Sequence, residues 1–158
     1  EYFDLKWKNR IKIMSQYIDK NSSILDLGCG EEWLKEFLSE DAKYYGCDYK
    51  KRSCETIVCD FNKYQFPIIK VDTCFVSGCL EYINDYDWFV KKIEETSREC
   101  IISYCSIEYY PNILDRNKHN WVNSLSESEI ICIFRSHGFH LKDLVHSDTM
   151  NSIFYFSK

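Results

Sequence analysis

The 158-residue sequence has no surplus of basic residues, since 20 Lys and Arg stand against 25 Asp and Glu for a formal net charge of −5. This balance argues against a broad electrostatic footprint for nucleic acid or an anionic membrane. No apolar run approaches the roughly 20 residues of a membrane span, and no signal-peptide pattern is visible at the start. Internal repeats are absent as well. These absences favour one cytoplasmic globular domain over residues 1–158, without a membrane partner.

Nine cysteines are present, but the pattern of a disulfide framework or a zinc site is not. The count is odd, no Cys-x-x-Cys pair occurs, and Cys47, Cys59, Cys74 and Cys100 lie in or beside apolar, strand-like runs. Reduced, buried thiols in an intracellular protein are the better interpretation. The cysteine spacings also lack the short knuckle of a zinc site, so we expect no metal.

Hydrophobic periodicity predicts an α/β domain with helices on both faces of a seven-stranded sheet. The strands are expected at 23–27, 43–48, 55–60, 71–78, 99–107, 139–147 and 152–158, and the helices at 1–20, 31–40, about 85–97 and 126–138. Ser126 and Glu129 have the spacing of a capping box. Segment 108–125 is polar and aromatic, and is expected to be an irregular excursion.

Two connections between strands are too short for the crossover helix that joins parallel neighbours, which takes a dozen residues or more. The helix between the strands at 43–48 and 55–60 is therefore expected to be shortened or lost. The turn "DTMN" at 148–151 requires the last strand to run antiparallel. A nicotinamide-binding sheet would more naturally end with a parallel strand.

A third glycine is missing from the stretch "SILDLGCGEEWL" at 23–34. Gly28 and Gly30 let the backbone turn tightly and approach a ligand. Asp48 follows twenty residues after Gly28 and ends the second strand, where a carboxylate accepts ribose hydroxyls. The third glycine of the dinucleotide pattern would fall at Trp33. These residues suit an adenosine ligand without establishing which one.

Two carboxylates occupy the place where a pyrophosphate would bind. Glu31 and Glu32 are expected in the first turn of the helix at 31–40, a position that a dinucleotide phosphate would otherwise take. They would repel the phosphate, whereas a cationic ligand would be attracted. An adenosine cofactor that lacks phosphate and carries positive charge therefore fits better.

The stretches "LDLGCGEEWL", "YYGCDY", "VCDFN" and "VDTCFVSGCLEYI" together resemble the class I S-adenosylmethionine-dependent methyltransferases, especially the small single-domain members. The resemblance runs from about residue 20 to the end. It implies a Rossmann-like, mostly parallel seven-stranded sheet with an antiparallel last strand, with S-adenosylmethionine as cofactor and S-adenosylhomocysteine as product. Two departures are Glu32 at the family's third glycine position and the lost helix after Asp48, which thins the adenine pocket.

Carried over by position, the resemblance implies roles for residues at the ends of four strands. The methionine end of the cofactor would be lined by Asp26, Gly28, Cys29 and Gly30. Asp48 would hold the ribose, Tyr49 would cover the adenine edge, and the adenine would be bound by Asp60 and Phe61. The methyl group would meet its acceptor near Ser77, Gly78 and Glu81. Asp26 as a turn former and Phe61 as a core residue remain alternatives.

The acceptor is expected to be a small molecule or glycan precursor, most readily one methylated at a hydroxyl. The N-terminal helix and the 108–125 excursion are expected to cover it. His119, Tyr109 and Glu81 are the candidate catalytic residues, since a general base assists methylation of a hydroxyl. A solvated His119 remains an alternative. No Asn-Pro-Pro-Tyr-like signature follows the fourth strand, so a nucleic-acid base is not expected.

Two other function classes stay open. A degenerate protein of the same fold could serve as a binding or regulatory subunit, which the lost helix and the lack of a clear base favour. An NAD-linked oxidoreductase is disfavoured by Trp33 and by the acidic residues after the glycine turn. The oligomeric state is not predicted by the sequence.

Overall fold

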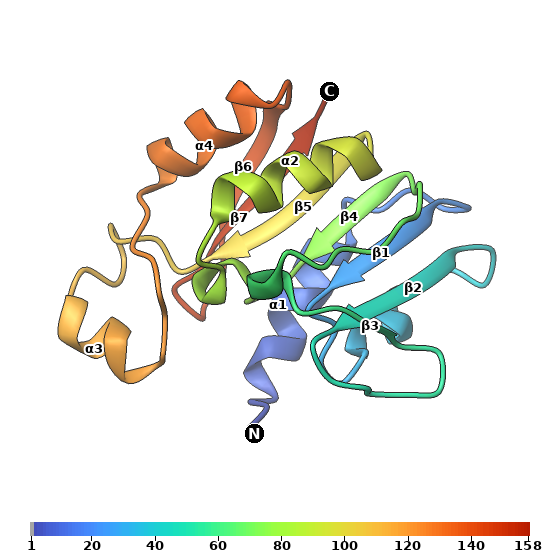
Figure 1. The fold of residues 1–158 in the computed structure, drawn as a ribbon, viewed down its shortest axis with the longest axis horizontal. Helices are drawn as coiled ribbons and strands as arrows, with labels where there is room; N and C mark the ends of the chain where they lie inside the picture. Colours follow the sequence, from blue (N-terminus) through green and yellow to red (C-terminus); the bar gives the residue numbers. More distant parts are fainter. Residues whose placement is uncertain (1) are drawn as a thin grey trace.

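The computed structural model describes residues 2–158. Its seven-stranded sheet has the strand order β3-β2-β1-β4-β5-β7-β6 (Figure 1). The strands are β1 (Ser23–Leu27), β2 (Lys43–Asp48), β3 (Ile57–Val58), β4 (Thr73–Val76), β5 (Glu99–Tyr104), β6 (His140–His146) and β7 (Ser152–Ser157). The helices are α1 (Lys6–Ser15), α2 (Tyr86–Thr96), α3 (Ile113–Lys118) and α4 (Glu127–Ser136), with 3₁₀ turns η1 (Trp33–Phe37), η2 (Phe61–Lys63) and η3 (Leu80–Tyr82).

β7 runs antiparallel between β5 and β6, whereas the pairs among β1 to β5 are parallel. The prediction of an antiparallel last strand is confirmed, because the short turn before β7 leaves no room for a crossover. The expected strand at 55–60 is reduced to the two residues of β3, and no helix separates it from β2. The loss of that helix is confirmed too.

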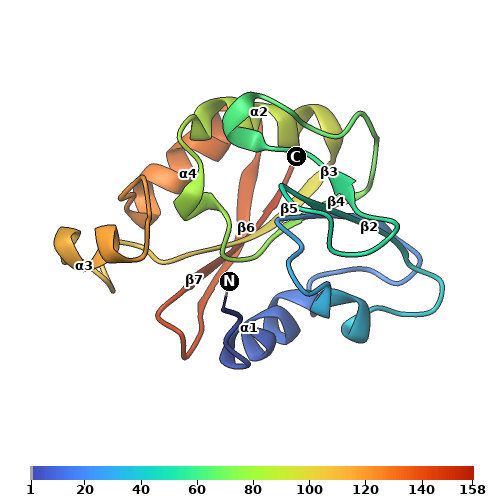
Figure 2. The same cartoon turned by 60° about the horizontal axis from the view of Figure 1, so that its bottom comes forward.

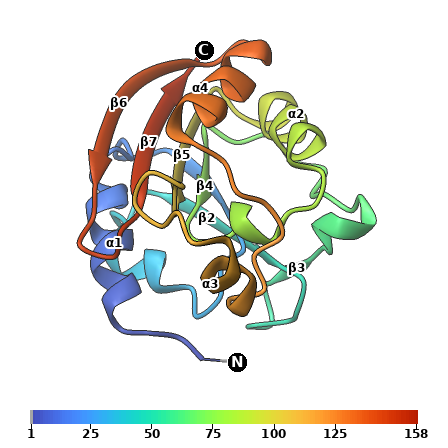
Figure 3. The same ribbon diagram turned by 90° about the vertical axis from the view of Figure 1, so that its left-hand side faces the viewer.

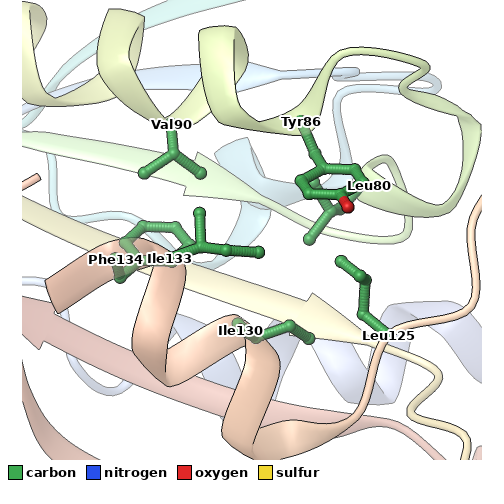
Figure 4. A pocket seen from close by; sticks show the side chains of 7 residues that line it. All are labelled: Leu80, Tyr86, Val90, Leu125, Ile130, Ile133 and Phe134. Atoms are coloured by element: carbon green, nitrogen blue, oxygen red, sulfur yellow. The ribbon is translucent and has the colours of Figure 1, made fainter. Parts of the chain in front are cut away.

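Helices cover both faces of the sheet, as expected. α2 and α4 pack on one face and α1 with η1 on the other (Figure 2). Side chains from Val90 on α2 and from Ile130 and Phe134 on α4 point toward one another in an apolar crevice without room for a ligand (Figure 4). Met14 of α1 and Leu34 of η1 are buried against the opposite face. The sheet is therefore buried between two apolar layers, and its strand ends are left to form a site.

The predicted helix at 31–40 is wrong, because only the 3₁₀ turn η1 forms there. Glu32 takes a left-handed conformation with φ 56° directly before η1, which prevents a helix from starting at residue 31. Leu38 is already extended, so the turn also ends early. Glu31 and Glu32 therefore have no helix dipole to stabilise their charges.

The excursion at 108–125 is less irregular than predicted, since it contains α3. Asn112 caps this helix by accepting hydrogen bonds from the backbone N–H groups of Leu114 and Asp115. Figure 3 looks onto the carboxyl ends of the parallel strands and shows α3 in front of them. The excursion thus stands at the edge where ligands bind in open α/β sheets.

Candidate functional site

A cavity of about 900 Å³ lies at the carboxyl ends of the parallel strands. This volume is near the upper end of small-molecule sites, about 300–1,000 Å³. Its lining includes every predicted cofactor residue, namely Asp26, Gly28, Cys29, Gly30, Asp48, Tyr49, Asp60, Phe61, Ser77 and Gly78, and the predicted catalytic residues Glu81 and His119. The structure therefore brings together residues from strand ends that are far apart in the sequence.

The glycine turn after β1 has the backbone geometry that only glycine adopts readily. Gly28 and Gly30 have φ values of 77° and 49°. The N–H of Gly28 donates to the carbonyl of Cys47 at 2.8 Å, which fixes the turn to β2. A Cβ atom on Gly28 would lie 2.9 Å from the Sγ of Cys79, and one on Gly30 would lie 2.7 Å from the ring of Phe3. Any larger residue would fill the approach to the turn.

Asp48 links the end of β2 to the glycine turn. Its Oδ2 accepts the N–H of Gly30 at 2.9 Å, and the residue is only 3% exposed. Its Oδ1 accepts the N–H of Lys50 at 3.2 Å and a guanidinium N–H of Arg52 at 3.1 Å. Both carboxylate oxygens are engaged within the chain, so a ribose at Asp48 would have to displace or share the bond from Arg52.

Asp26 lies beside the turn and is 4% exposed. The hydroxyl of Tyr44 donates to its Oδ2 at 2.7 Å. Burial raises the pKa of Asp26 to about 7, and the nearby charges of Asp48 and Glu32 act in the same direction. The side chain therefore changes charge near neutral pH while facing the cavity.

Of the two glutamates after the turn, only Glu31 lines the cavity. Glu32 instead accepts hydrogen bonds from the hydroxyl of Ser53 at 3.1 Å and from the ammonium of Lys35 at 2.9 Å. The prediction that both carboxylates face a ligand at a helix start is thus wrong, since there is no helix start and Glu32 is held elsewhere. The lining carboxylates beside the turn are those of Asp26, Glu31 and Asp48.

The segment after β3 forms the far wall of the cavity. The Oδ1 of Asp60 accepts the N–H of Asn62 at 3.1 Å, which caps η2. Phe61 lines the cavity and also packs in the core, with its ring centroid 5.0 Å from that of Phe89. Tyr49 is about half exposed at the rim. Phe61 therefore combines the two alternatives that the sequence left open.

Glu81 is a buried carboxylate on the cavity, at 2% exposure. Its Oε1 accepts the N–H of Cys105 at 2.9 Å, whereas its Oε2 has no hydrogen-bond partner within residues 2–158. Burial raises the pKa of Glu81, and the positive charges of Arg10 and Arg116 oppose the shift. An unpartnered, buried carboxylate oxygen is well suited to accept a hydrogen bond from a ligand.

The excursion supplies an aromatic wall. His119 Nε2 lies 3.2 Å from the hydroxyl of Tyr110, and its ring stacks on Trp121 at 4.8 Å between centroids. Tyr109 does not line the cavity, because its ring packs against His146 at 4.7 Å. The prediction that His119 and Tyr109 act in the same site is therefore not supported for Tyr109.

Two buried arginines at the site, Arg116 and Arg10, belong to no sequence motif. Arg116 is fully buried and donates to the carbonyl of Cys105 at 2.7 Å and to the hydroxyl of Tyr104 at 3.0 Å, which fastens the excursion to β5. Arg10 on α1 lines the cavity. Its position four residues before buried Met14 placed it on the apolar face of the helix, a signal that could have identified it.

The structure indicates neither a metal site nor a membrane helix in its described part. Within residues 2–158, no group of three or more His, Cys, Asp or Glu side chains could hold a metal ion. No helix in that range has the length and apolar character to cross a bilayer.

No family model matches the chain, and no curated protein matches it either. Solved structures do. Magnesium protoporphyrin IX methyltransferase from Synechocystis, with bound S-adenosylhomocysteine, is 13% identical with a TM-score of 0.77 over 98% of this chain and 84% of that one.

Two further structures agree. An S-adenosylmethionine-dependent methyltransferase from Mesorhizobium loti is 14% identical, with a TM-score of 0.77 over 92% of this chain and 96% of that one. A Burkholderia thailandensis 1,6-didemethyltoxoflavin N1-methyltransferase is 13% identical, with a TM-score of 0.70 over 97% of this chain and 78% of that one. At such low identity the likeness establishes the fold. The chain has the Rossmann-like fold of the class I S-adenosylmethionine-dependent methyltransferases.

Proposed function

We propose that this protein is an S-adenosylmethionine-dependent methyltransferase acting on a small-molecule acceptor. One observation carries the proposal: Asp26, the Gly28–Gly30 turn, Asp48 and Asp60 come from three successive strand ends of the sheet and meet in one cavity. The Synechocystis and Burkholderia neighbours were crystallised with S-adenosylhomocysteine, the product of such a reaction.

The charges around the glycine turn support a cationic cofactor. S-Adenosylmethionine supplies an electrophilic methyl group on a sulfonium when bound. Asp26 and Glu31 attract the positive groups of the methionine end, and the turn at Gly28 lets the backbone approach them. Asp48 would take the ribose by exchanging its bond from Arg52, and Asp60 with Phe61 would take the adenine. These residues bind and orient, which is the main task in an in-line displacement.

The acceptor is proposed to lie between Glu81 and the aromatic wall of the excursion. Transfer to a hydroxyl requires a group that takes its proton, and Glu81 Oε2 and His119 both line this half of the cavity. A small sugar-like or hydroxylated ring would pack on Trp121 while its hydroxyl reaches one of them. All nine cysteines are free thiols, which favours a reducing compartment such as the cytoplasm.

A second candidate is a degenerate protein that binds a ligand or a partner without catalysis. The observation in its favour is that both oxygens of Asp48 are already engaged, by the N–H groups of Gly30 and Lys50 and by Arg52. In that case Asp48 would serve to fix the glycine turn rather than to bind ribose.

Calorimetric titration with S-adenosylmethionine, S-adenosylhomocysteine and NAD tests the proposal. We expect micromolar binding of the first two and much weaker binding of NAD. Asp48→Asn keeps an acceptor for Gly30 but removes the charge, and it should weaken S-adenosylhomocysteine binding at least about tenfold, in line with charged hydrogen bonds of about 1.5–3 kcal/mol. Asp41→Asn, at an exposed turn, is the matched control. Tighter binding of NAD, or no binding of S-adenosylhomocysteine, would contradict the proposal.

A further inference from the structure

The aromatic wall of the excursion consists of Tyr110, His119 and Trp121, which line the cavity together. The hydroxyl of Tyr110 lies 3.2 Å from Nε2 of His119, and the His119 ring stacks on the Trp121 indole with 4.8 Å between centroids. The Tyr110 ring meets the indole edge-on, at 5.5 Å between centroids. The imidazole is therefore held both on one face and at one of its nitrogens.

Arg116 fixes this aromatic wall to the sheet. Its guanidinium lies 4.9 Å from the ring centroid of Trp121, and its Nη1 donates to the carbonyls of Tyr110 at 3.1 Å and Cys105 at 2.7 Å. Its own carbonyl accepts the N–H of His119 at 3.0 Å. Since Arg116 is fully buried and contacts all three members of the wall, the wall is preformed, as a site for chemistry requires.

The excursion is also bound to η3, which follows β4 and borders the cavity. The N–H of Val122 donates to the carbonyl of Glu81 at 2.8 Å. The side-chain amide of Asn123 donates to the carbonyl of Leu80, also at 2.8 Å. These bonds hold the aromatic wall beside the segment where the methyl group is proposed to meet its acceptor, and His119 lines the same cavity as Glu81.

Glu81 and His119 are the two side chains named above as able to take a proton from an acceptor. Burial raises the pKa of Glu81, which favours its neutral form. A neutral carboxyl group already carries the proton that a base must accept. A neutral imidazole, in contrast, always has one unprotonated nitrogen. His119 is therefore the better proton acceptor, provided that its unprotonated nitrogen is the one without a partner.

The hydroxyl of Tyr110 decides which nitrogen of His119 is unprotonated. Nε2 is engaged with this hydroxyl, whereas within residues 2–158 Nδ1 has no hydrogen-bond partner. If Nε2 carries the proton and donates it to the hydroxyl oxygen, Nδ1 keeps a free lone pair. If the hydroxyl donates instead, Nδ1 carries the proton and cannot act as a base. The direction of this one hydrogen bond therefore determines what His119 can do.

We propose that His119 takes the acceptor's proton at Nδ1, and that Tyr110 is a positioning residue whose hydroxyl oxygen accepts the Nε2–H of His119. The acceptor oxygen forms its bond to the methyl carbon, the carbon–sulfur bond breaks with its electron pair going to sulfur, and the acceptor's proton passes to Nδ1. The bond from Nε2–H to Tyr110 then becomes charge-assisted, and therefore stronger. The inference rests on the proposed function, but its first test does not need the cofactor.

The long-range ¹H–¹⁵N spectrum of the histidine rings, recorded at a pH where the rings are neutral, shows which nitrogen carries the proton. The chain contains its own references. Nε2 of His137 lies 2.8 Å from Asp87, and Nε2 of His146 lies 2.7 Å from Glu127. A carboxylate only accepts, so both of these rings carry the proton on Nε2. His140 is exposed and has no side-chain hydrogen bond within the described residues, so its ring should show both tautomers.

We expect the ring of His119, assigned with His119→Asn, to match the two references that are bonded to carboxylates. Tyr110→Phe keeps the aromatic ring but removes the oxygen, and should move the His119 nitrogens toward the mixed pattern of His140. Tyr109→Phe, whose ring packs against His146 outside the cavity, is the matched control and should leave His119 unchanged. A protonated Nδ1 in the wild type, or an unaltered His119 spectrum in Tyr110→Phe, would overturn the role of Tyr110.

Binding of a hydroxylated ring tests the role of His119 itself. Catechol, titrated onto protein saturated with S-adenosylhomocysteine, should shift the Nδ1 signal of His119, because its hydroxyl donates to that nitrogen. Tyr110→Phe should weaken catechol binding roughly two- to tenfold and reduce the shift. No response of Nδ1 to catechol would overturn His119 as the proton acceptor. If S-adenosylhomocysteine does not bind, the proposed function fails, whereas the tautomer spectra still decide whether Tyr110 positions His119.

Discussion

Asp26 is a buried carboxyl group on the cavity lining, and its pKa lies near neutral pH. Its carboxyl group has a pKa raised to about 7, chiefly by burial, and the negative charges of Asp48 and Glu32 add to the shift. The hydroxyl of Tyr44 and the charge of Lys35 act in the opposite direction. An unfolded Asp titrates near 3.9. Between about pH 4 and 7, the folded protein therefore holds a proton on Asp26 that the unfolded chain has released.

This difference predicts how stability depends on pH. The contribution of Asp26 to the free energy of unfolding is fully present below about pH 4. It is lost as the pH rises to about 7, at up to about 1.4 kcal/mol per pH unit. Urea denaturation of the wild type and of Asp26→Asn measures it as the difference between their free energies of unfolding. The free energy of unfolding of the wild type minus that of Asp26→Asn should decrease between about pH 5 and 7 and then level off. A difference that rises with pH, or stays constant, would contradict the prediction.

At the same scale, the sequence predicted the residues whose roles follow from spacing along the chain. Gly28, Gly30 and Asp48 were predicted to share one site because the turn and the next strand end are separated by a nearly fixed length of chain, and the structure places all three on one cavity. Arg10 was missed because its partner, Ser77, is 67 residues away. Such a contact depends on how α1 packs, which no local pattern encodes.

The segment at 31–40 shows the limit of prediction at the level of elements. "EEWLKEFLSE" has the residue types and spacing of an amphipathic helix, yet it forms only η1. The side chain of Glu32 is held by Ser53 and Lys35, and its backbone is left-handed. Tertiary contacts therefore override local propensity, which is a weak preference of less than about 1 kcal/mol per residue.

α4 is an element whose start was predicted correctly, because its signal is local. Ser126 Oγ accepts the N–H of Glu129, and the carboxylate of Glu129 accepts the N–H of Ser126 at 2.7 Å. Ser126→Ala should lower the free energy of unfolding by about 1 kcal/mol. Ser126→Thr keeps the acceptor oxygen and should cost clearly less. Urea denaturation of both variants measures the effect, and equal losses would show that the cap does not stabilise the helix.

At the level of the whole molecule, β7 joins the last hairpin to the body of the sheet. Phe156 is fully buried, with its ring stacked 4.1 Å from that of Phe134 on α4. Phe156→Ala should lower the free energy of unfolding by about 3–5 kcal/mol, a large part of the 5–15 kcal/mol typical of a domain. Tyr155→Phe, on the more exposed face of the same strand, is the control: it loses only the hydrogen bond from its hydroxyl to Glu99 and should cost about 0.5–1.5 kcal/mol. A loss below about 1 kcal/mol would mean that β7 packs loosely.

The directions of the strands were predictable from connection lengths, whereas the strand order and the cavity were not. Alternating elements indicate a parallel sheet, and a short turn indicates an antiparallel end. The cavity depends in addition on α1 and on the excursion, which lie far apart in the sequence and line the same space. Trp7 and Trp121 line the cavity, and Arg116 fastens the excursion to β5. None of the three belongs to a spaced motif, so their positions follow only from the three-dimensional structure.

The proposed division of the cavity into a cofactor half and an acceptor half predicts two separable responses to ligands. Hydrogen exchange measured by mass spectrometry should show that S-adenosylhomocysteine protects the backbone amides at 28–31 and 48–52, because these segments contribute to the cavity lining where we propose that the cofactor binds. The amides at 113–122 should remain as exchangeable as before, since the excursion lines the part of the cavity proposed for the acceptor. Their protection should require a second ligand. Protection of the excursion by S-adenosylhomocysteine alone, with none at the glycine turn, would mean that the cofactor binds in the half assigned to the acceptor.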